Sequence, residues 1–299
     1  MNVFEKDIIN IINSALEGKI PDLSGVLDFS YMYKFAKEQH LVGLIYYGLK
    51  DTKNVLKPND FFELQHSFLI LAAQSERQMF ETEKITFALR EESVEHMVLK
   101  GALLKKMYPH AEMRAMGDID IFFVNPTDCS KISNLMTKLG YHEIPGSDHE
   151  YVWVKGDAIR VEFHRSLMSK KHPLFNQYYS NVHLCKCGNA SEYSMSPEDT
   201  FVYLFVHFTK HFEEGGAGVK FIVDLYLYMK KYDALDYTYI SQEMKRLHIC
   251  KFYKNIIKLI DVWFAGGEDN EITDFITDKL FAYGVFGNKE NADAFEGVK

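Results

Sequence analysis

The sequence predicts an α+β fold in which a small mixed β-sheet lies between two helical regions. Apolar residues recur at helical spacing near both ends of the chain, whereas short runs of alternating apolar and polar residues fill its middle. Spacing near 3.6 residues is typical of amphipathic helices, and alternation is typical of strands with one buried face. We therefore expect an N-terminal helical region (1–95), a β-sheet core (96–190) and a C-terminal helical region (191–299).

Three helices are expected in the N-terminal region. The first has apolar residues at helical spacing from Phe4 to Leu16, and Gly18 is a typical residue to end it. A second helix is predicted over 31–49. A third starts after the Pro-Asn-Asp sequence at 58–60 and reaches about residue 93, either continuous or broken. Its inner stripe is made by Leu64, Phe68, Leu71, Ser75 and Met79.

The core contains a Gly-Asp-Ile-Asp-Ile-Phe-Phe stretch at 117–123, within a predicted strand over 118–124. Side chains alternate along a strand, so Asp118 and Asp120 share one face and the two isoleucines point to the other. Two like charges so close repel by about 4 kcal/mol at an effective dielectric constant near 20. Such a pair needs a cation or a proton, and Mg²⁺ is the usual cation. An Asp-x-Asp pair alone is equally compatible with a solvated strand edge.

Upstream of this pair, the residues predict a strand, a tight turn and a helix. Val98 and Leu99 end a short buried strand, Gly101 allows the turn, and a helix follows over 102–107. Free backbone N–H groups and the helix dipole make such a turn a phosphate cradle, although a Lys-Gly turn is also common without that role. Lys100 and Arg114 supply cations that can neutralise phosphate.

Downstream, a helix over 126–139 that ends at Gly140 precedes a predicted β-hairpin. The hairpin pairs residues 151–154 with 158–164 across the turn 155–157. Glu162 shares a face of the second strand with Arg160 and His164. If this strand lies beside the Asp118 strand, Glu162 becomes a third carboxylate of the site; otherwise it is an ordinary solvent-facing residue.

The C-terminal region is predicted to be helical after a start signal at 196–199, where Ser, Pro and two acidic residues follow each other. The glycine-rich stretch 213–218 breaks the first helix. His207 and His211 lie four residues apart on one helical face, but no metalloprotease motif accompanies them. Further helices are expected over 219–231, 237–247, 250–265 and 270–283, and a polar, frayed tail after Gly287.

Composition narrows the class of function. The 299 residues carry a net charge of −8, which argues against binding to long duplex nucleic acid, because such proteins are usually basic. The N-terminus lacks a signal-peptide pattern, and no apolar run approaches the length of a membrane span. Cys185 and Cys187 are too close together for the usual zinc pair, so all four cysteines are expected to be free thiols. We therefore expect a cytoplasmic protein that does not bind membranes.

Three segments together resemble a known family. Leu-Lys-Gly at 99–101, Arg-x-x-Gly-Asp-x-Asp at 114–120 and Val-Glu-x-His at 161–164 are similar, in the same order, to the nucleotidyltransferases of the DNA polymerase β superfamily. The pattern resembles above all a branch of bacterial proteins known only as uncharacterised nucleotidyltransferases. The resemblance is close over 98–164 and looser over 196–199 and 207–224.

The resemblance implies a metal-dependent enzyme that transfers an NMP from an NTP, with ATP among the candidate donors, to an acceptor hydroxyl or phosphate and releases pyrophosphate. Two Mg²⁺ ions, with Mn²⁺ as the alternative, would bind to Asp118, Asp120 and Glu162 and clamp the triphosphate. The helical module before the core would shape the acceptor side. The nucleotide- or acceptor-binding residues implied by the resemblance are Lys100, Gly101, Ala102, Arg114, Gly117, Lys210, His211 and Asp224.

The sequence departs from the superfamily at Ala102, where Ser or Gly is usual, so a hydroxyl contact to phosphate is absent. Two alternatives remain open: a non-catalytic nucleotide- or partner-binding module on the same fold, and a metal-dependent phosphohydrolase. The acceptor is unknown; because the chain is acidic, a cationic small molecule or a protein is favoured over an RNA end.

Overall fold

The computed structural model describes residues 1–23, 28–52, 55–147, 149–156, 159–188 and 191–284. The predicted frayed tail and two residues of the predicted hairpin, Asp157 and Ala158, lie outside this range. The chain forms two compact units, each built from separated stretches. Unit 1 comprises Met1–Ala72, Met107–Ala115 and, from Phe201, the remainder of the described chain; unit 2 comprises Ala73–Lys106 and Met116–Thr200.

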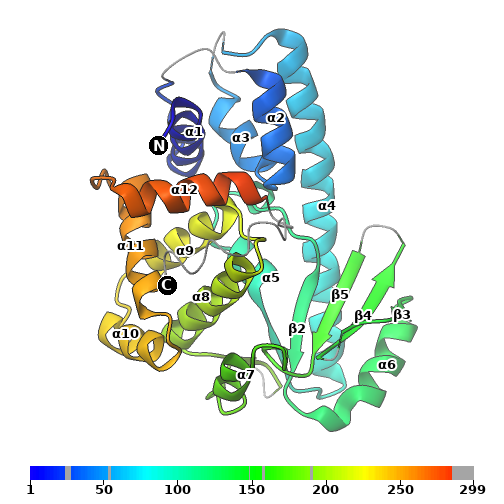
Figure 1. Cartoon of the computed structure of the whole chain (residues 1–299). Coiled ribbons are helices and arrows are strands. Elements are labelled where there is room, and N and C mark those ends of the chain that lie inside the picture. The colour runs from blue at the N-terminus through cyan, green and yellow to red at the C-terminus, as the bar shows by residue number, and fades with distance from the viewer. Residues whose placement is uncertain (24–27, 53–54, 148, 157–158, 189–190, 285–299) are drawn as a thin grey trace. The chain divides into compact units, whose positions relative to one another are not determined.

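Unit 2 contains a five-stranded mixed sheet with the strand order β1-β2-β5-β4-β3 (Figure 1). The central pair, β2 and β5, is parallel, and the other neighbouring strands are antiparallel. The predicted small mixed sheet and the predicted hairpin, which is the β4–β5 pair, are therefore confirmed. The strands are β1 (His96–Val98), β2 (Ile119–Phe123), β3 (His142–Ile144), β4 (Glu150–Lys155) and β5 (Ile159–His164).

One face of this sheet forms the core of unit 2. Ile119 and Ile121 of β2 and Val161 and Phe163 of β5 are fully buried there. They belong to one apolar cluster with side chains of helix α4 (Pro58–Glu91), which passes behind the sheet in Figure 1, and of helix α6 (Cys129–Lys138). Because side chains alternate, the opposite face of β2 and β5 is left for polar residues.

The shorter elements of unit 2 follow the prediction with small differences. The predicted helix 126–139 is a 3-10 turn, η2 (Pro126–Asp128), followed by α6, and Gly140 with φ +85° follows its end. The predicted helix 102–107 is α5 (Lys100–Lys105) and starts two residues earlier. Four elements of unit 2 were not predicted: β3, α7 (Pro173–Tyr179), β6 (Cys185–Lys186) and β7 (Tyr193–Ser194).

The first helices of unit 1 also match the prediction, with one correction. Helix α1 (Val3–Glu17) ends at Gly18, whose φ is +66°. The single helix predicted over 31–49 was wrong: the structure has α2 (Phe29–Glu38) and α3 (Val42–Leu49). His40, at φ +57°, reverses the backbone between them. Helix α4 begins at Pro58, slightly before the predicted start, which lay after residues 58–60, and it is continuous to Glu91, contributing to both units.

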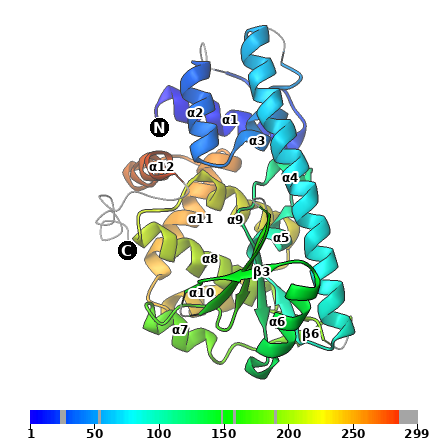
Figure 2. The ribbon, with the colours of Figure 1, turned by 90° about the vertical axis from the view of Figure 1, so that its right-hand side faces the viewer.

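The C-terminal helices of unit 1 lie within one or two residues of their predicted bounds. Helices α8, α9 and α11 lie side by side in Figures 1 and 2, and aromatic rings join them; for example, Phe208 of α8 stacks on Phe252 of α11 with centroids 5.5 Å apart. The remaining bounds are η1 (Ala111–Met113), α8 (Pro197–Glu213), α9 (Val219–Lys231), α10 (Tyr237–Arg246), α11 (Cys250–Phe264) and α12 (Glu271–Tyr283).

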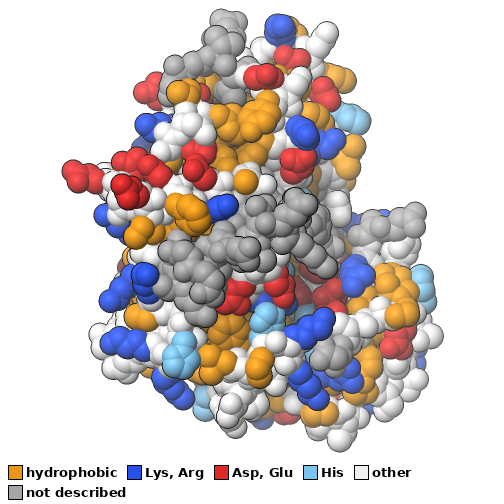
Figure 3. Space-filling model, in the orientation of Figure 1, with side chains coloured by type: hydrophobic (Ala, Val, Ile, Leu, Met, Phe, Trp, Pro, Cys, Tyr) orange, Lys and Arg blue, Asp and Glu red, His pale blue; other side chains and the backbone are white. Residues whose placement is uncertain are grey.

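The surface agrees with the acidic composition. On the face shown in Figure 3, acidic side chains gather around the start of α12, where Glu268, Asp269 and Glu271 are exposed.

The four cysteines are free, as predicted. Among the described residues, no helix is both long and apolar enough to cross a bilayer.

Candidate functional site

The parallel pairing of β2 and β5 brings two predicted site residues together on the polar face of the sheet. Asp120 of β2 is directly opposite Glu162 of β5 in the register. His164, two residues further along β5, lies on the same face, and its Nε2 atom is 2.8 Å from Asp120 Oδ1. Ligand atoms of Asp120, Glu162 and His164 all lie within 4.8 Å of one another, close enough to bind a single cation.

The Asp120 carboxylate is buried, and neighbouring side chains compensate its negative charge. Besides the imidazole of His164, the Lys100 Nζ atom lies 3.3 Å from its Oδ1 atom. Burial by itself would raise the pKa of the carboxyl group, but the charge of Lys100 and the hydrogen bond with His164 outweigh it and hold the pKa well below its usual range. Asp120 is therefore ionised at neutral pH.

Asp118, directly before β2, has the opposite character. Its pKa is raised from 3.8 to about 7, first by burial and then by the charges of Asp120 and Glu162, while Lys100 and His164 oppose the rise only in part. Without a bound cation, this site therefore holds more negative charge than its own side chains neutralise. A perturbed carboxyl group beside a specific charge partner is typical of functional sites.

The turn before α5 differs from the predicted one. The positive φ falls on Lys100 (+32°), not on Gly101, which is the second residue of the helix. The Ala102 side chain is buried in the apolar cluster of unit 2, so its methyl group does not face the acidic residues. Gly117 is exposed, and a Cβ atom added there would meet nothing within 4 Å. The backbone in front of Asp118 is thus open to a ligand.

Two other predicted binding residues, Arg114 and Asp224, bind each other inside unit 1. Arg114 Nε donates to Asp224 Oδ1 at 2.7 Å and Arg114 Nη2 donates to Asp224 Oδ2 at 2.9 Å, a bidentate pair. The Tyr108 hydroxyl also donates to Asp224 Oδ1 at 2.8 Å. All three side chains are buried. The pairing indicates a structural role for residues that the sequence suggested as nucleotide or acceptor ligands.

Lys210 and His211 lie in the last turn of α8, also in unit 1. The Nε2 atoms of His207 and His211 are 3.1 Å apart, as their spacing of four residues along a helix allows. Both rings lie near the Phe221 ring of α9, with centroids 6.0 and 5.5 Å away.

Sequence reasoning assigned no role to two residues next to the acidic group. Glu150 begins β4 and is directly opposite His164 in the β4–β5 register, and His149 precedes it. His149, Glu150 and His164 form a second group whose ligand atoms lie within 4.8 Å of one another. The hairpin prediction implied that the strands pair, but the register that brings these three together was not predicted.

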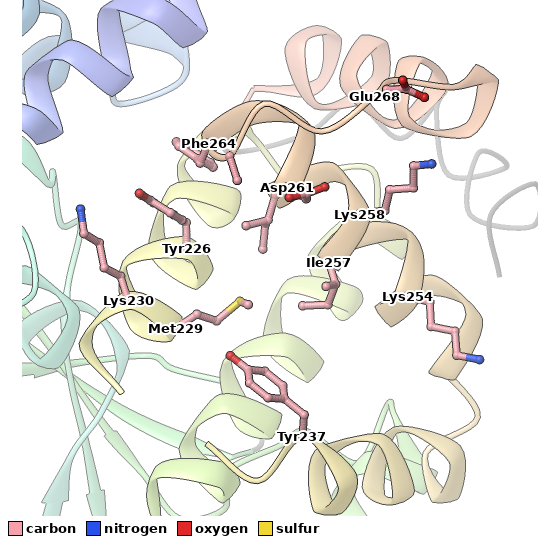
Figure 4. Close-up of a pocket in the computed structure, with 12 residues that line it drawn as sticks. Tyr226, Met229, Lys230, Tyr237, Lys254, Ile257, Lys258, Asp261, Phe264 and Glu268 are labelled. Atoms are coloured by element: carbon pink, nitrogen blue, oxygen red, sulfur yellow. The ribbon is translucent and has the colours of Figure 1, made fainter. Parts of the chain in front are cut away.

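An open pocket of about 810 Å³ lies on unit 1 between α9, α10 and α11 (Figure 4). The rings of Tyr226 and Phe264 stack at its wall with centroids 4.1 Å apart. Three lysines, Lys230, Lys254 and Lys258, surround it. None of the residues predicted to bind nucleotide or metal lines it.

Comparison with known proteins agrees with this geometry. The family model described as uncharacterised nucleotidyltransferase matches residues 26–265. The chain belongs to this family. The match includes all three acidic residues of the sheet and both histidines of α8, and it confirms the predicted enzyme class, a nucleotidyltransferase. No curated protein matches the sequence.

Two solved structures are similar to this chain at low sequence identity. The antibiotic-resistance factor ANT(2'')-Ia is 12% identical, with a TM-score of 0.41, over 63% of this chain and 97% of its own. The Megavirus polyadenylate synthase is 11% identical, with a TM-score of 0.37, over 62% of this chain and 40% of its own. At such identities, neither structure indicates a substrate for this chain.

Proposed function

We propose that this nucleotidyltransferase moves an NMP from an NTP to an acceptor hydroxyl or phosphate, with release of pyrophosphate, at the site formed by Asp118, Asp120 and Glu162. The observation that carries the proposal is the grouping of three carboxylates and one lysine around the first half of β2, on the face turned away from the core.

The residues fit a pair of Mg²⁺ ions. Carboxylate oxygens are the hard ligands that Mg²⁺ prefers. The pKa of Asp118 is raised first by burial and then by the charges of Asp120 and Glu162, and a bound cation would offset that negative charge. Asp118, Asp120 and Glu162 would hold the metal, and Mn²⁺ can use the same ligands. When bound, the metal would supply charge neutralisation for the triphosphate and for the leaving pyrophosphate.

The side chains of the protein have distinct tasks in this proposal. Lys100, which neutralises Asp120 in the structure described here, can turn to a phosphate once a metal binds to that carboxylate. The exposed Gly117 leaves room for the triphosphate beside the backbone. Glu162, held at its Oε1 atom by Arg160 Nε at 2.8 Å, would complete the metal site and help to activate the acceptor hydroxyl.

The acceptor remains open among a small molecule, a protein side chain and an RNA end. The net charge of −8 favours a cationic small molecule or a protein. A cytoplasmic location, where NTPs and Mg²⁺ are abundant, suits this activity.

The first test is the thermal stability of the full chain with each of the four NTPs, with and without Mg²⁺. A ligand present at a hundred times its Kd adds about 2.7 kcal/mol of stability. We expect a Mg²⁺-dependent rise in melting temperature with at least one NTP, lost in Asp118→Ala and kept in Glu143→Gln, a control on the exposed side of β3. A rise that Asp118→Ala retains in full would refute the site.

Transfer is tested with the same NTP labelled on its α-phosphate. Glu162→Gln should still bind the nucleotide but transfer label to acceptors much more slowly than the wild type. Binding without transfer by the wild type, over a broad acceptor screen, would favour the non-catalytic module. Release of NMP into water without any acceptor would favour the phosphohydrolase.

A further inference from the structure

We propose that His149, Glu150 and His164 form a binding site for one divalent transition-metal ion of the Zn²⁺ class, distinct from the all-carboxylate Mg²⁺ site. This inference concerns different ligand atoms and does not rest on the proposed function. It follows from the convergence of two imidazole nitrogens on one carboxylate oxygen.

The distances suit a common ion. Glu150 Oε2 lies 3.6 Å from His149 Nε2 and 3.8 Å from His164 Nδ1. Two ligands about 2.0–2.1 Å from a tetrahedral zinc ion are roughly 3.3 Å apart, so small side-chain movements bring these atoms to coordinating positions. A His₂Glu set with one remaining position for water or another ligand is a known zinc arrangement.

The outer nitrogen of each histidine is held by an oxygen atom. His164 Nε2 is 2.8 Å from Asp120 Oδ1, and His149 Nδ1 is 2.8 Å from Ser147 Oγ. Histidines that bind metals nearly always have their second ring nitrogen hydrogen-bonded to a carboxylate, a carbonyl or water, which fixes the tautomer and the ring orientation. In both rings, the other nitrogen faces the carboxylate of Glu150.

Two features of the backbone pairing fix the positions of these three residues. Glu150 and His164 are directly opposite in the antiparallel β4–β5 register, so their side chains leave the sheet together. The Arg165 N–H donates to the His149 carbonyl at 2.8 Å, which continues the pairing to the third ligand. The three side chains are 17%, 13% and 5% exposed, so an ion there would be largely shielded from water yet reachable.

The nitrogen ligands set the selectivity. Imidazole suits Zn²⁺, Co²⁺, Ni²⁺ and Cu²⁺, whereas Mg²⁺ prefers oxygen. An ion on His164 Nδ1 would also require the proton of that ring to stay on Nε2, facing Asp120. A metal ion bound there would therefore fix the hydrogen bond between His164 Nε2 and Asp120, and with it the position of the Asp120 carboxylate.

Zinc binding to the full chain is measured by competition with a chromophoric zinc indicator, after chelator treatment and with millimolar Mg²⁺ present. We expect His149→Ala and Glu150→Gln each to lose one zinc ion or to bind it at least tenfold more weakly than the wild type. Two controls should keep it: His142→Ala, an exposed histidine of β3, and His207→Ala, which removes the histidine pair of α8.

Co²⁺ spectroscopy supplies a second readout. Co²⁺ in the wild type should give the visible bands of a low-coordinate site with nitrogen ligands, and His149→Ala should lose them. Asp118→Asn should keep them, because it alters only the Mg²⁺ site; this separates the inference from the proposed function. Equal zinc stoichiometry and affinity in the wild type and in folded His149→Ala would overturn the proposal and leave a simple His–Glu ion pair.

Discussion

The raised pKa of Asp118 makes a quantitative prediction: Asp118→Asn should stabilise the protein when no metal is present. A carboxyl group whose pKa is higher in the folded state than in the unfolded state contributes most stability below the unfolded pKa. That contribution is lost as the pH rises from about 4 towards 7 and stays lost above it. At 1.36 kcal/mol for each pKa unit, the rise from 3.8 to about 7 costs about 4 kcal/mol at pH 8.

Asparagine removes the charge but keeps a buried polar group, so we expect about 2–4 kcal/mol of stabilisation at pH 8, and almost none near pH 4. The assay is thermal or urea unfolding of both proteins in chelator, from pH 4 to 8.5. With a shift of roughly 2–4 °C for each kcal/mol, the melting temperatures should differ by several degrees at pH 8.

Added Mg²⁺ should close this gap, because it stabilises only the wild type. Glu143→Gln, an exposed carboxylate of the same unit, should show no such pH dependence. A raised pKa of Asp118 is excluded if Asp118→Asn is no more stable than the wild type at pH 8, or if the difference in stability is the same at pH 4 and pH 8.

Three further variants should lower stability, each measured by urea unfolding. Asp120→Asn should destabilise the protein at neutral pH, a change opposite in sign to that of Asp118→Asn, because it removes the buried charge that pairs with the half-buried Lys100; an increase in stability would contradict this. Asp224→Ala should cost about 3–5 kcal/mol, because it removes the carboxylate that compensates the charge of the buried Arg114. The double variant, Asp224→Ala with Arg114→Met, should cost less than the sum of the two single changes. Gly48→Ala should cost about 1–3 kcal/mol, because the new Cβ atom would lie 2.4 Å from the carbonyl oxygen of Ile11; a neutral result would mean that the two helices separate easily.

Local sequence was sufficient for most individual elements. The start of α8 at Pro197, the end of α1 at Gly18 and the bounds of α9 follow from capping residues and apolar spacing, which act within a few residues. Local sequence did not predict the backbone conformation where a contact with a distant segment determines it. The reversal at His40 divides a stretch with continuous helical spacing, and the adjacent Gln39 accepts a hydrogen bond from the N–H of Val219, 180 residues away.

For the site, local sequence was enough to predict the chemistry: alternation places Asp118 and Asp120 on one face, and alternation in β5 places Glu162 and His164 on one face. Which of these residues meet depends on how the strands pair. The parallel register pairs Asp120 with Glu162, the β4–β5 register adds Glu150, and the fold pairs Arg114 with Asp224 instead of leaving both for a ligand. The physical reason is that alternation is a property of one strand, whereas register and burial depend on how separate segments pack, which no local pattern records.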